Sequence, residues 1–177
     1  MKDKYLIRKV DGLGRIVIPK EIRNRINIDE NDYLEFFYNS EYMLIKKYSR
    51  LNKLGNLLQE ITDILNEYSN SEVLIIEKDN IVAYSGINKD MYINKKPSKN
   101  MIKAINRRES LFEEYEKNLE IIDGDIIKCS YINEAIIFND EVLGLICLYN
   151  IEKKVTKEEY KLVKLVIKYI SKYLEEI

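Results

Sequence analysis

The sequence predicts two folded domains, a small β-rich domain over residues 1–50 and an α+β domain over residues 51–177. Short segments of alternating apolar and polar residues fill the first part, whereas a helical apolar periodicity begins at Leu51. The charge balance changes at the same place: residues 1–50 carry 11 Lys and Arg against 8 Asp and Glu, and the remaining residues carry 18 against 22. A basic part joined to an acidic part indicates that the first part meets an anion such as nucleic acid.

The first domain is predicted to consist of four short strands and one helix. The strands are expected over residues 5–10, 15–18, 33–38 and 42–46. Pro19 suits the first turn of a helix that runs from Lys20 to Ile26, and the turn at Asn39 joins the last two strands into a hairpin. A domain of this size buries little core, and pairing with a second copy is the simplest way to enlarge that core.

The run LGRIVIPKEIR, from Leu13 to Arg23, resembles the AbrB-type swapped-hairpin family, and the similarity covers nearly all of residues 1–50. In that family two chains interleave their hairpins into one intertwined, barrel-like dimer, and arginines on one face of the dimer contact double-stranded DNA. The resemblance therefore implies a DNA-binding homodimer, with no cofactor. The positions that match the family's DNA contacts are Arg8, Lys9, Arg15 and Arg23, and we add the neighbouring Asn24 and Arg25 as candidate DNA contacts.

The chemistry of these side chains agrees with that assignment. Arginine is always charged, and its planar fork can pair bidentately with a phosphate or with a guanine edge. Family members often carry a second arginine after the position of Arg23, whereas here Asn24 follows and Arg25 comes next, so the target preference is expected to differ. Glycine is usual in the family at the positions of Asn27 and Asn31. Asparagine tolerates positive φ best after glycine, so both turns should be preserved.

The second domain is predicted to alternate helices and strands. Helices are expected over residues 51–68, from Lys99 to Arg107 behind a Ser98 cap, and from a capping box at Thr156 to Ile177. Strands are expected over residues 72–77, 81–85, 126–132, 134–138 and 142–149. The acidic residues Glu113, Glu114 and Glu116 are interpreted as a solvated loop or helix face rather than a metal site. This order predicts an antiparallel sheet with helices on one side.

The stretch IIFNDEVLGLICLYN within this second domain resembles a GAF domain. An AbrB-type domain, a helical connector and a GAF-like domain together resemble developmental transcription regulators of spore-forming bacteria. The resemblance implies a protein that activates some promoters and represses others in the forespore. No residue set for a GAF ligand can be placed, so any small-molecule ligand stays unknown.

Two apolar stripes in this domain admit two interpretations. Leu51, Leu54, Leu58, Ile61, Leu65 and Tyr68 form the first stripe, and Val163, Ile167, Ile170, Leu174 and Ile177 form the second. Each stripe could pack on the core of its own domain, or it could form a helical bundle between subunits. The second interpretation predicts an assembly larger than the N-terminal dimer, a homotetramer held by the C-terminal domains.

Several classes of function are disfavoured by what the sequence lacks. It has no histidine, no CxxC pair, no phosphate-binding glycine-rich loop and no nucleophile elbow, so neither a catalytic site nor a metal site is expected. Cys129 and Cys147 are interpreted as buried small apolar residues. No apolar run reaches the ~20 residues that cross a bilayer, and no signal peptide is recognisable, so a cytoplasmic protein is expected. Two alternatives stay open, an AbrB-fold antitoxin and an oligomerisation module that senses nothing.

Overall fold

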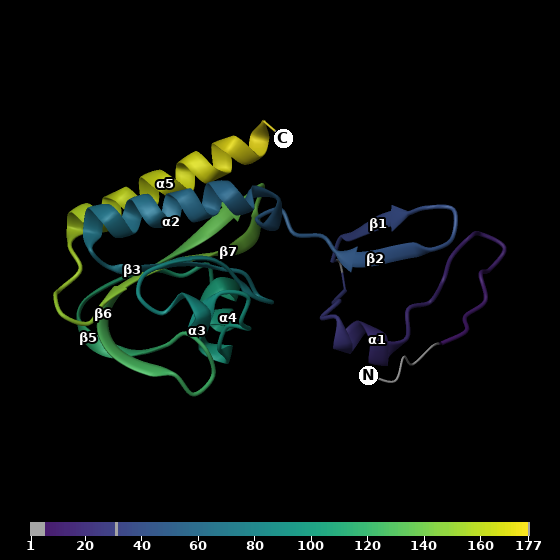
Figure 1. The fold of residues 1–177 in the computed structure, drawn as a ribbon, viewed down its shortest axis with the longest axis horizontal. Helices are drawn as coiled ribbons and strands as arrows, with labels where there is room; N and C mark the ends of the chain where they lie inside the picture. The colour runs from purple at the N-terminus through teal and green to yellow at the C-terminus, as the bar shows by residue number, and fades with distance from the viewer. Residues whose placement is uncertain (1–5, 31, 177) are drawn as a thin grey trace. The chain divides into compact units, whose positions relative to one another are not determined.

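The computed structural model describes residues 6–30 and 32–176 and divides the chain into two compact units, Met1–Ser49 and Arg50–Ile177. Figure 1 shows the first unit as a short helix and a hairpin, and the second as a sheet with helices. Each helix among the described residues is too short or too polar to span a lipid bilayer.

The N-terminal unit contains helix α1 (Lys20–Arg25) and an antiparallel hairpin of β1 (Leu34–Tyr38) and β2 (Met43–Lys47). The hairpin confirms the pair expected there. Its turn is closed by Asn39, whose side-chain oxygen accepts hydrogen bonds from the backbone N–H groups of Glu41 at 2.8 Å and Tyr42 at 2.9 Å. Such a bond is the reason that asparagine favours turns.

Residues 6–10 and 15–18 form neither helix nor strand, contrary to the two strands expected there; Tyr5, the first residue of the earlier one, lies outside the described residues. Their alternating pattern is typical of a strand, but a strand also needs a neighbouring chain segment that completes its hydrogen-bond ladder. The described residues of one chain pair only β1 with β2 in this unit. The sequence pattern alone did not show that these segments lack a strand partner among the described residues of one chain.

The turn after α1 confirms the expectation for Asn27. Its φ is 51°, the left-handed region that glycine and asparagine tolerate best. Asn31, the second position at which the family favours glycine, lies outside the described residues.

The C-terminal unit is built on a five-stranded antiparallel sheet in the order β4-β3-β7-β6-β5. Its strands are β3 (Glu72–Ile76), β4 (Ile81–Ser85), β5 (Ser110–Glu120), β6 (Ile126–Phe138) and β7 (Glu141–Asn150). Its helices are a 3-10 turn η1 (Asn52–Leu54), α2 (Gly55–Ser69), α3 (Lys89–Tyr92), α4 (Lys99–Asn106) and α5 (Lys157–Glu175). The central strand β7 pairs with β3 on one side and β6 on the other.

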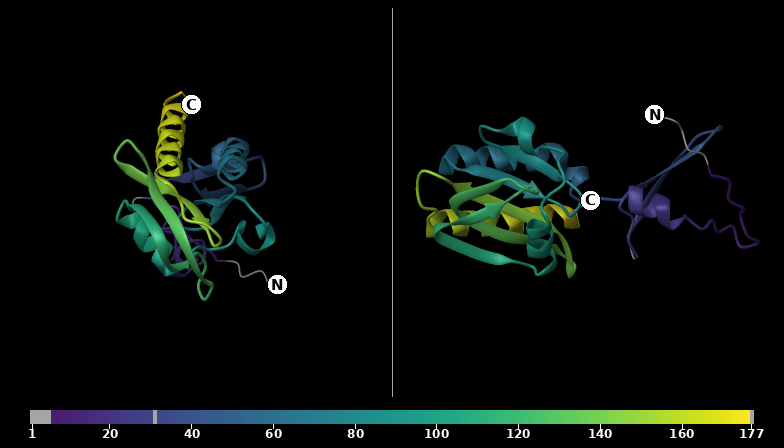
Figure 2. Two further views of the ribbon diagram at one scale, coloured as in Figure 1. Left: turned by 90° about the vertical axis from the view of Figure 1, so that its left-hand side faces the viewer. Right: turned by 90° about the horizontal axis from the view of Figure 1, so that it is seen from below.

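Helices cover both faces of this sheet, so the expectation of helices on one side was wrong. The helices α2 and α5 pack with one face, and α3 and α4 lie over the other, as Figures 1 and 2 show. The reason is visible in the central strands. Val73, Leu74, Ile75 and Ile76 in β3 are all buried, and strands that are apolar on both faces need cover on both.

The edge of the sheet also differs from the prediction. The acidic residues Glu113, Glu114 and Glu116 lie in the edge strand β5, not in a loop or helix. The two strands expected over residues 126–132 and 134–138 are one continuous strand, β6. Because β5 carries its charges on an exposed edge, it lacks the apolar alternation by which half-buried strands are recognised.

The helix caps follow the sequence prediction. The Ser98 hydroxyl accepts a hydrogen bond from Met101 N at 3.1 Å and begins α4. At α5, Thr156 Oγ1 accepts from Glu159 N at 3.2 Å while the Glu159 carboxylate accepts from Thr156 N at 2.6 Å. This reciprocal pair is the capping box expected from the sequence.

Both apolar stripes are largely used inside their own unit. Leu51, Leu58 and Leu65 of the first stripe are buried, and Val163 and Ile170 of the second are fully buried in the same core cluster. Tyr68 is the exception in the first stripe, since it is 63% exposed. The core interpretation is thus correct for these buried residues. Ile177 lies outside the described residues.

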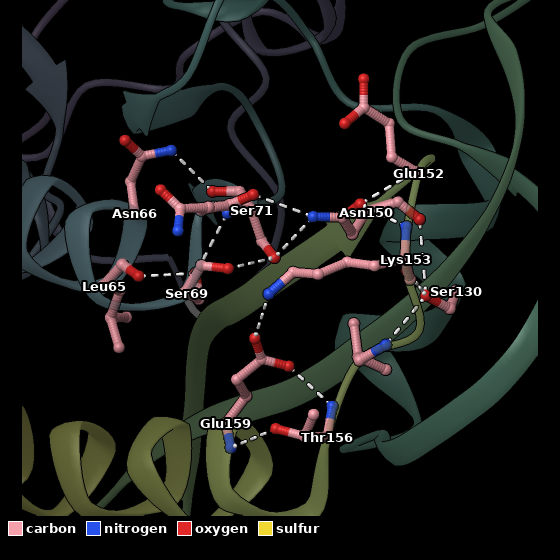
Figure 3. Close-up of polar contacts among 12 residues, drawn as sticks. Leu65, Asn66, Ser69, Ser71, Ser130, Asn150, Glu152, Lys153, Thr156 and Glu159 are labelled. Carbon is pink, nitrogen blue, oxygen red and sulfur yellow. Dashed lines mark hydrogen bonds and ion pairs between the residues drawn. The ribbon is translucent and has the colours of Figure 1, made fainter.

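A buried polar network joins the end of α2 to the loop before α5 (Figure 3). The Asn150 side chain donates to Asn70 O at 2.9 Å and to Ser71 Oγ at 3.0 Å. Its oxygen accepts from the backbone N–H groups of Glu152 and Lys153, both at 2.9 Å. All four bonding positions of one 8%-exposed amide are therefore satisfied.

Candidate nucleic-acid interface

The turn from Asp11 to Arg15 shapes the first part of the candidate interface. Gly14 N donates to Asp11 O at 3.0 Å, and Asp11 N donates to Arg15 O at 3.1 Å, which closes the turn in both directions. Gly14 has a φ of 78°, a conformation that a residue with a Cβ adopts only with strain. The glycine of the Leu-Gly-Arg motif is thus required by the backbone that presents Arg15.

Asp11 and Arg15 are also joined through their side chains. The guanidinium Nε of Arg15 donates to Asp11 Oδ2 at 2.7 Å, while Asp11 Oδ1 accepts from Leu13 N at 2.9 Å and Arg15 N at 2.8 Å. The backbone hydrogen bond from Arg15, followed by the bond from its guanidinium, lowers the pKa of the Asp11 carboxyl below its ordinary value. The Arg15 side chain is nevertheless 72% exposed, so it remains accessible to a ligand.

Helix α1 presents the second part of the candidate interface. Pro19 occupies its N-cap position, and the half-buried Ile22 faces inward. Arg23, Asn24 and Arg25 are exposed in its last turn, where cations interact favourably with the helix dipole. Residues two apart on a helix point in nearly opposite directions, so one chain does not present Arg23 and Arg25 on a single face.

Arg8 and Lys9 lie in the exposed segment before the turn. Among the residues that the structure describes, the Arg8 guanidinium donates to its neighbouring carbonyl, Ile7 O, at 3.4 Å. Within the described part of one chain, no hydrogen bond or ion pair connects any two of the six side chains assigned to DNA. They form an exposed set of cations and one amide, separated along the chain rather than gathered in a pocket.

Asp11 is the residue of this region that sequence analysis did not single out. The signal was present, because an aspartate at the start of a Gly-containing turn typically accepts the backbone N–H group two residues ahead. What the sequence did not show is that the second carboxylate oxygen meets the Arg15 guanidinium.

The N-terminal unit of a single chain buries very little apolar surface. Ile28 is the buried hydrophobic residue among its described positions, at 7% exposure. Ile7, Val17 and Tyr38 are 82%, 77% and 85% exposed. An exposed apolar surface this extensive marks an interaction surface.

In the described part of the C-terminal unit, the cysteines and several tyrosines are buried. Cys129 and Cys147 are buried, and burial raises the pKa of the Cys129 thiol to about 12. Tyr92 donates to Asp125 Oδ2 at 2.7 Å and Tyr84 donates to Glu72, so the hydroxyls of these two buried tyrosines have partners. No cluster of metal-ligating side chains is found in the described residues.

Comparison with protein families assigns a model to each unit. Residues 53–175 match the family described as "Stage V sporulation protein T C-terminal, transcription factor". Residues 7–52 match the family described as "Antidote-toxin recognition MazE, bacterial antitoxin".

Curated relatives match both the whole chain and its first unit. Stage V sporulation protein T of Bacillus subtilis is 32% identical over 178 residues, which is 99% of this chain and 100% of the relative. Transition state regulatory protein AbrB of the same organism is 41% identical over 63 residues, which is 36% of this chain and 65% of the relative.

Solved structures with the same fold confirm the GAF-like architecture of the C-terminal unit. The GAF domain of a phosphoenolpyruvate-protein phosphotransferase from Acinetobacter has a TM-score of 0.54 at 11% identity and covers 70% of this chain and 82% of that chain. The corresponding GAF domain from Coxiella burnetii has a TM-score of 0.54 at 13% identity, with 89% and 90% covered.

Proposed function

The chain belongs to the stage V sporulation protein T family, and from this premise we propose that it is a sequence-specific DNA-binding transcription regulator. The observation that carries the proposal is the full-length match, because it places an AbrB-like unit and a GAF-like unit together in one chain. In this proposal residues 1–50 bind DNA and residues 51–177 regulate or assemble the protein. The antitoxin alternative is disfavoured because the second part is a folded unit with its own core, not a short tail.

The proposed DNA contacts are made by the exposed cations of the first unit. Arg15 and Arg23 carry a positive charge and a planar donor fork on a tight turn and a helix end, where they can reach phosphates or guanine edges. Arg8, Lys9 and Arg25 add charge, and the Asn24 amide can bond a base or a phosphate without adding charge.

A second copy of the chain completes the N-terminal unit in this proposal. The exposed Ile7, Val17 and Tyr38 would be covered, and residues 6–10 and 15–18 would gain strand partners. The swapped-hairpin dimer implied by the AbrB resemblance satisfies both needs. It also doubles the number of cations that meet the DNA, and its two-fold symmetry suits a target with two half-sites.

The outer faces of α2 and α5 support a further association, into a tetramer. The outer face of α2 is acidic and apolar, and that of α5 is basic and apolar. The α2 face carries Glu60, Ile64, Glu67 and Tyr68; the α5 face carries Lys161, Leu165, Lys168, Tyr169, Lys172 and Tyr173. A second copy that set its α5 against α2 would pair apolar with apolar and acid with base, which fixes partner and register.

The assembly proposal can be tested with one substitution on this face. Leu165 is 63% exposed, and Leu165→Asp should reduce the full chain from a tetramer to a dimer in multi-angle light scattering. Ile126→Asp is the matched control, because Ile126 is 64% exposed on β6. A dimer already in the wild type, or a tetramer that persists in Leu165→Asp, would exclude this interface.

In the cell, the proposed role is control of sporulation genes in the forespore, by activation at some promoters and repression at others. The family name and the match to a sporulation protein support it. Whether the GAF-like unit binds a small molecule is tested by thermal-shift screening with nucleotides and amino acids, because a ligand of the native state raises the melting temperature.

DNA binding is tested by fluorescence anisotropy of the full chain with AT-rich promoter duplexes at about 50 and 200 mM salt. If 6 to 10 phosphates are engaged, affinity should fall by roughly 10³- to 10⁵-fold between these concentrations. Arg15→Ala and Arg23→Ala should each weaken binding, whereas Lys96→Ala, which removes an exposed cation from the other unit, should not. Failure of the wild type to bind any duplex, or equal binding by all variants, would refute the proposal.

A further inference from the structure

We propose that Asp11 is a positioning residue that holds the Arg15 guanidinium in the orientation in which it meets DNA. The inference rests on the proposed function, since Arg15 matters here as a DNA contact. Asp11 does not touch DNA in this proposal. It acts through Arg15.

The Asp11 carboxylate is itself fixed by the turn. Its Oδ1 accepts two backbone hydrogen bonds, from Leu13 N at 2.9 Å and Arg15 N at 2.8 Å. The backbone bonds between Asp11 and Arg15 close the same turn. Oδ2 therefore has a defined place beside the Arg15 side chain.

Oδ2 engages the guanidinium at one atom only. Arg15 Nε donates to it at 2.7 Å, and the Arg15 side chain makes no other hydrogen bond or ion pair with the described residues. The two Nη groups are left available at the far end of the planar group. That end is the fork that pairs with two oxygens of a phosphate, or with O6 and N7 of guanine.

This arrangement lowers the ordering cost of binding. An exposed arginine samples many rotamers, and a bidentate contact requires one of them. Because Asp11 already restrains the Nε end, less conformational freedom is lost when the fork binds. A bidentate base contact depends on this orientation more than a phosphate contact does, so Asp11 should affect the preference for the target sequence.

The charge of Asp11 has an opposite and separable effect. A carboxylate close to DNA repels every phosphate, so its removal should strengthen binding to all duplexes alike. Positioning, in contrast, favours the duplex whose bases Arg15 reads. The ratio of affinities for a selected duplex and a scrambled duplex therefore reports positioning, whereas the common change in both affinities reports repulsion.

Asp11→Asn separates the roles of the two carboxylate oxygens. The asparagine oxygen can still accept from Leu13 N and Arg15 N, so the turn is kept. Its amide nitrogen is a donor and cannot accept from Arg15 Nε. Asp90→Asn is the matched control for the loss of one negative charge, because Asp90 is exposed in α3 of the other unit.

The experiment uses the full chain, a duplex obtained from a random pool by in vitro selection with the wild type, and a scrambled duplex of equal length. Asp11→Asn should lower the affinity ratio by about 2- to 12-fold, which corresponds to the entropic cost of immobilising one side chain on binding. Asp90→Asn should leave it unchanged. In an Arg15→Ala background, Asp11→Asn should have no further effect on the ratio.

The outcomes separate the two proposals. If Arg15→Ala leaves binding unchanged, the proposed DNA surface is wrong. If Arg15→Ala weakens binding but Asp11→Asn leaves the affinity ratio at its wild-type value, the positioning role is wrong and DNA binding stands. The same conclusion follows if Asp11→Asn lowers the affinity ratio as much in the Arg15→Ala background as in the wild type.

A second measurement on the wild type needs no variant. In an arginine-selective NMR spectrum of the full chain, the Arg15 Nε–H proton should exchange with water more slowly than that of Arg23. The proton of Arg15 is held by a carboxylate, whereas the Arg23 side chain is exposed at the helix end. Equal exchange rates would overturn the positioning role even if Asp11→Asn failed to fold.

Discussion

Asn150→Ala should be among the most destabilising single changes in the C-terminal unit. The amide makes four hydrogen bonds, two that it donates to the end of α2 and two that it accepts from the loop before α5 (Figure 3). Each such bond contributes about 0.5–1.5 kcal/mol net. Water that enters the shortened site will satisfy part of what is lost, so we expect the free energy of unfolding to fall by about 2–4 kcal/mol.

Urea denaturation of the full chain, followed by far-UV circular dichroism, measures this loss. The helical signal reports mainly on the C-terminal unit, because α1 has only 6 residues whereas α2 and α5 have 15 and 19. Ser71→Ala removes one of the four bonds and should cost about 1 kcal/mol. Asn118→Ala, at an exposed position of β5, is the control. A loss below about 1 kcal/mol for Asn150→Ala, with an unchanged denaturant slope, would refute the reasoning.

Three further predictions test other parts of the fold. Thr156→Ala removes the capping box of α5 and should lower the free energy of unfolding by about 1 kcal/mol, whereas Thr156→Ser should keep it; equal urea midpoints would contradict the cap. Asn27→Gly should be tolerated, but Asn27→Val should cost about 1–3 kcal/mol because φ is 51°; equal stability of the two variants would exclude a strained turn. Cys129, whose pKa burial raises to about 12, and Cys147 should resist a thiol reagent at pH 8 until the protein is unfolded. Rapid reaction of the native protein would show that they are accessible.

The parts of the fold that the sequence predicted well are those fixed by local chemistry. Ser98 and Thr156 begin helices because their hydroxyls accept backbone N–H groups a few residues ahead, and that spacing is visible in the sequence. Asn27 and Asn39 close turns for equally local reasons.

The parts that could not be predicted depend on neighbours distant in the sequence. Among the described residues, the edge strand β5 pairs with β6 alone. Its exposed positions include charged side chains, so its sequence shows no apolar alternation. The stripe from Leu51 to Leu65 was compatible with a core or a subunit interface. The structure shows that its leucines belong to the core, because they are buried in one cluster with side chains of the sheet. In the candidate interface, the arginines could be predicted from a family motif. The proposed role of Asp11 could be recognised only from the structure, which shows where its second carboxylate oxygen lies.

The pairing of β3 with β7 has a consequence for the order of folding. Ile75 lies opposite Ile146, and β4, α3, α4, β5 and β6 all come between them in the chain. Closing so long a loop costs entropy before the contact is gained, so this central pairing should form late. While a ribosome still holds β7, α2 can already pack on the hairpin of β3 and β4, but the edge of β3 that later pairs with β7 is bare. A chaperone that binds unpaired strand edges would bind this chain before β7 pairs with β3.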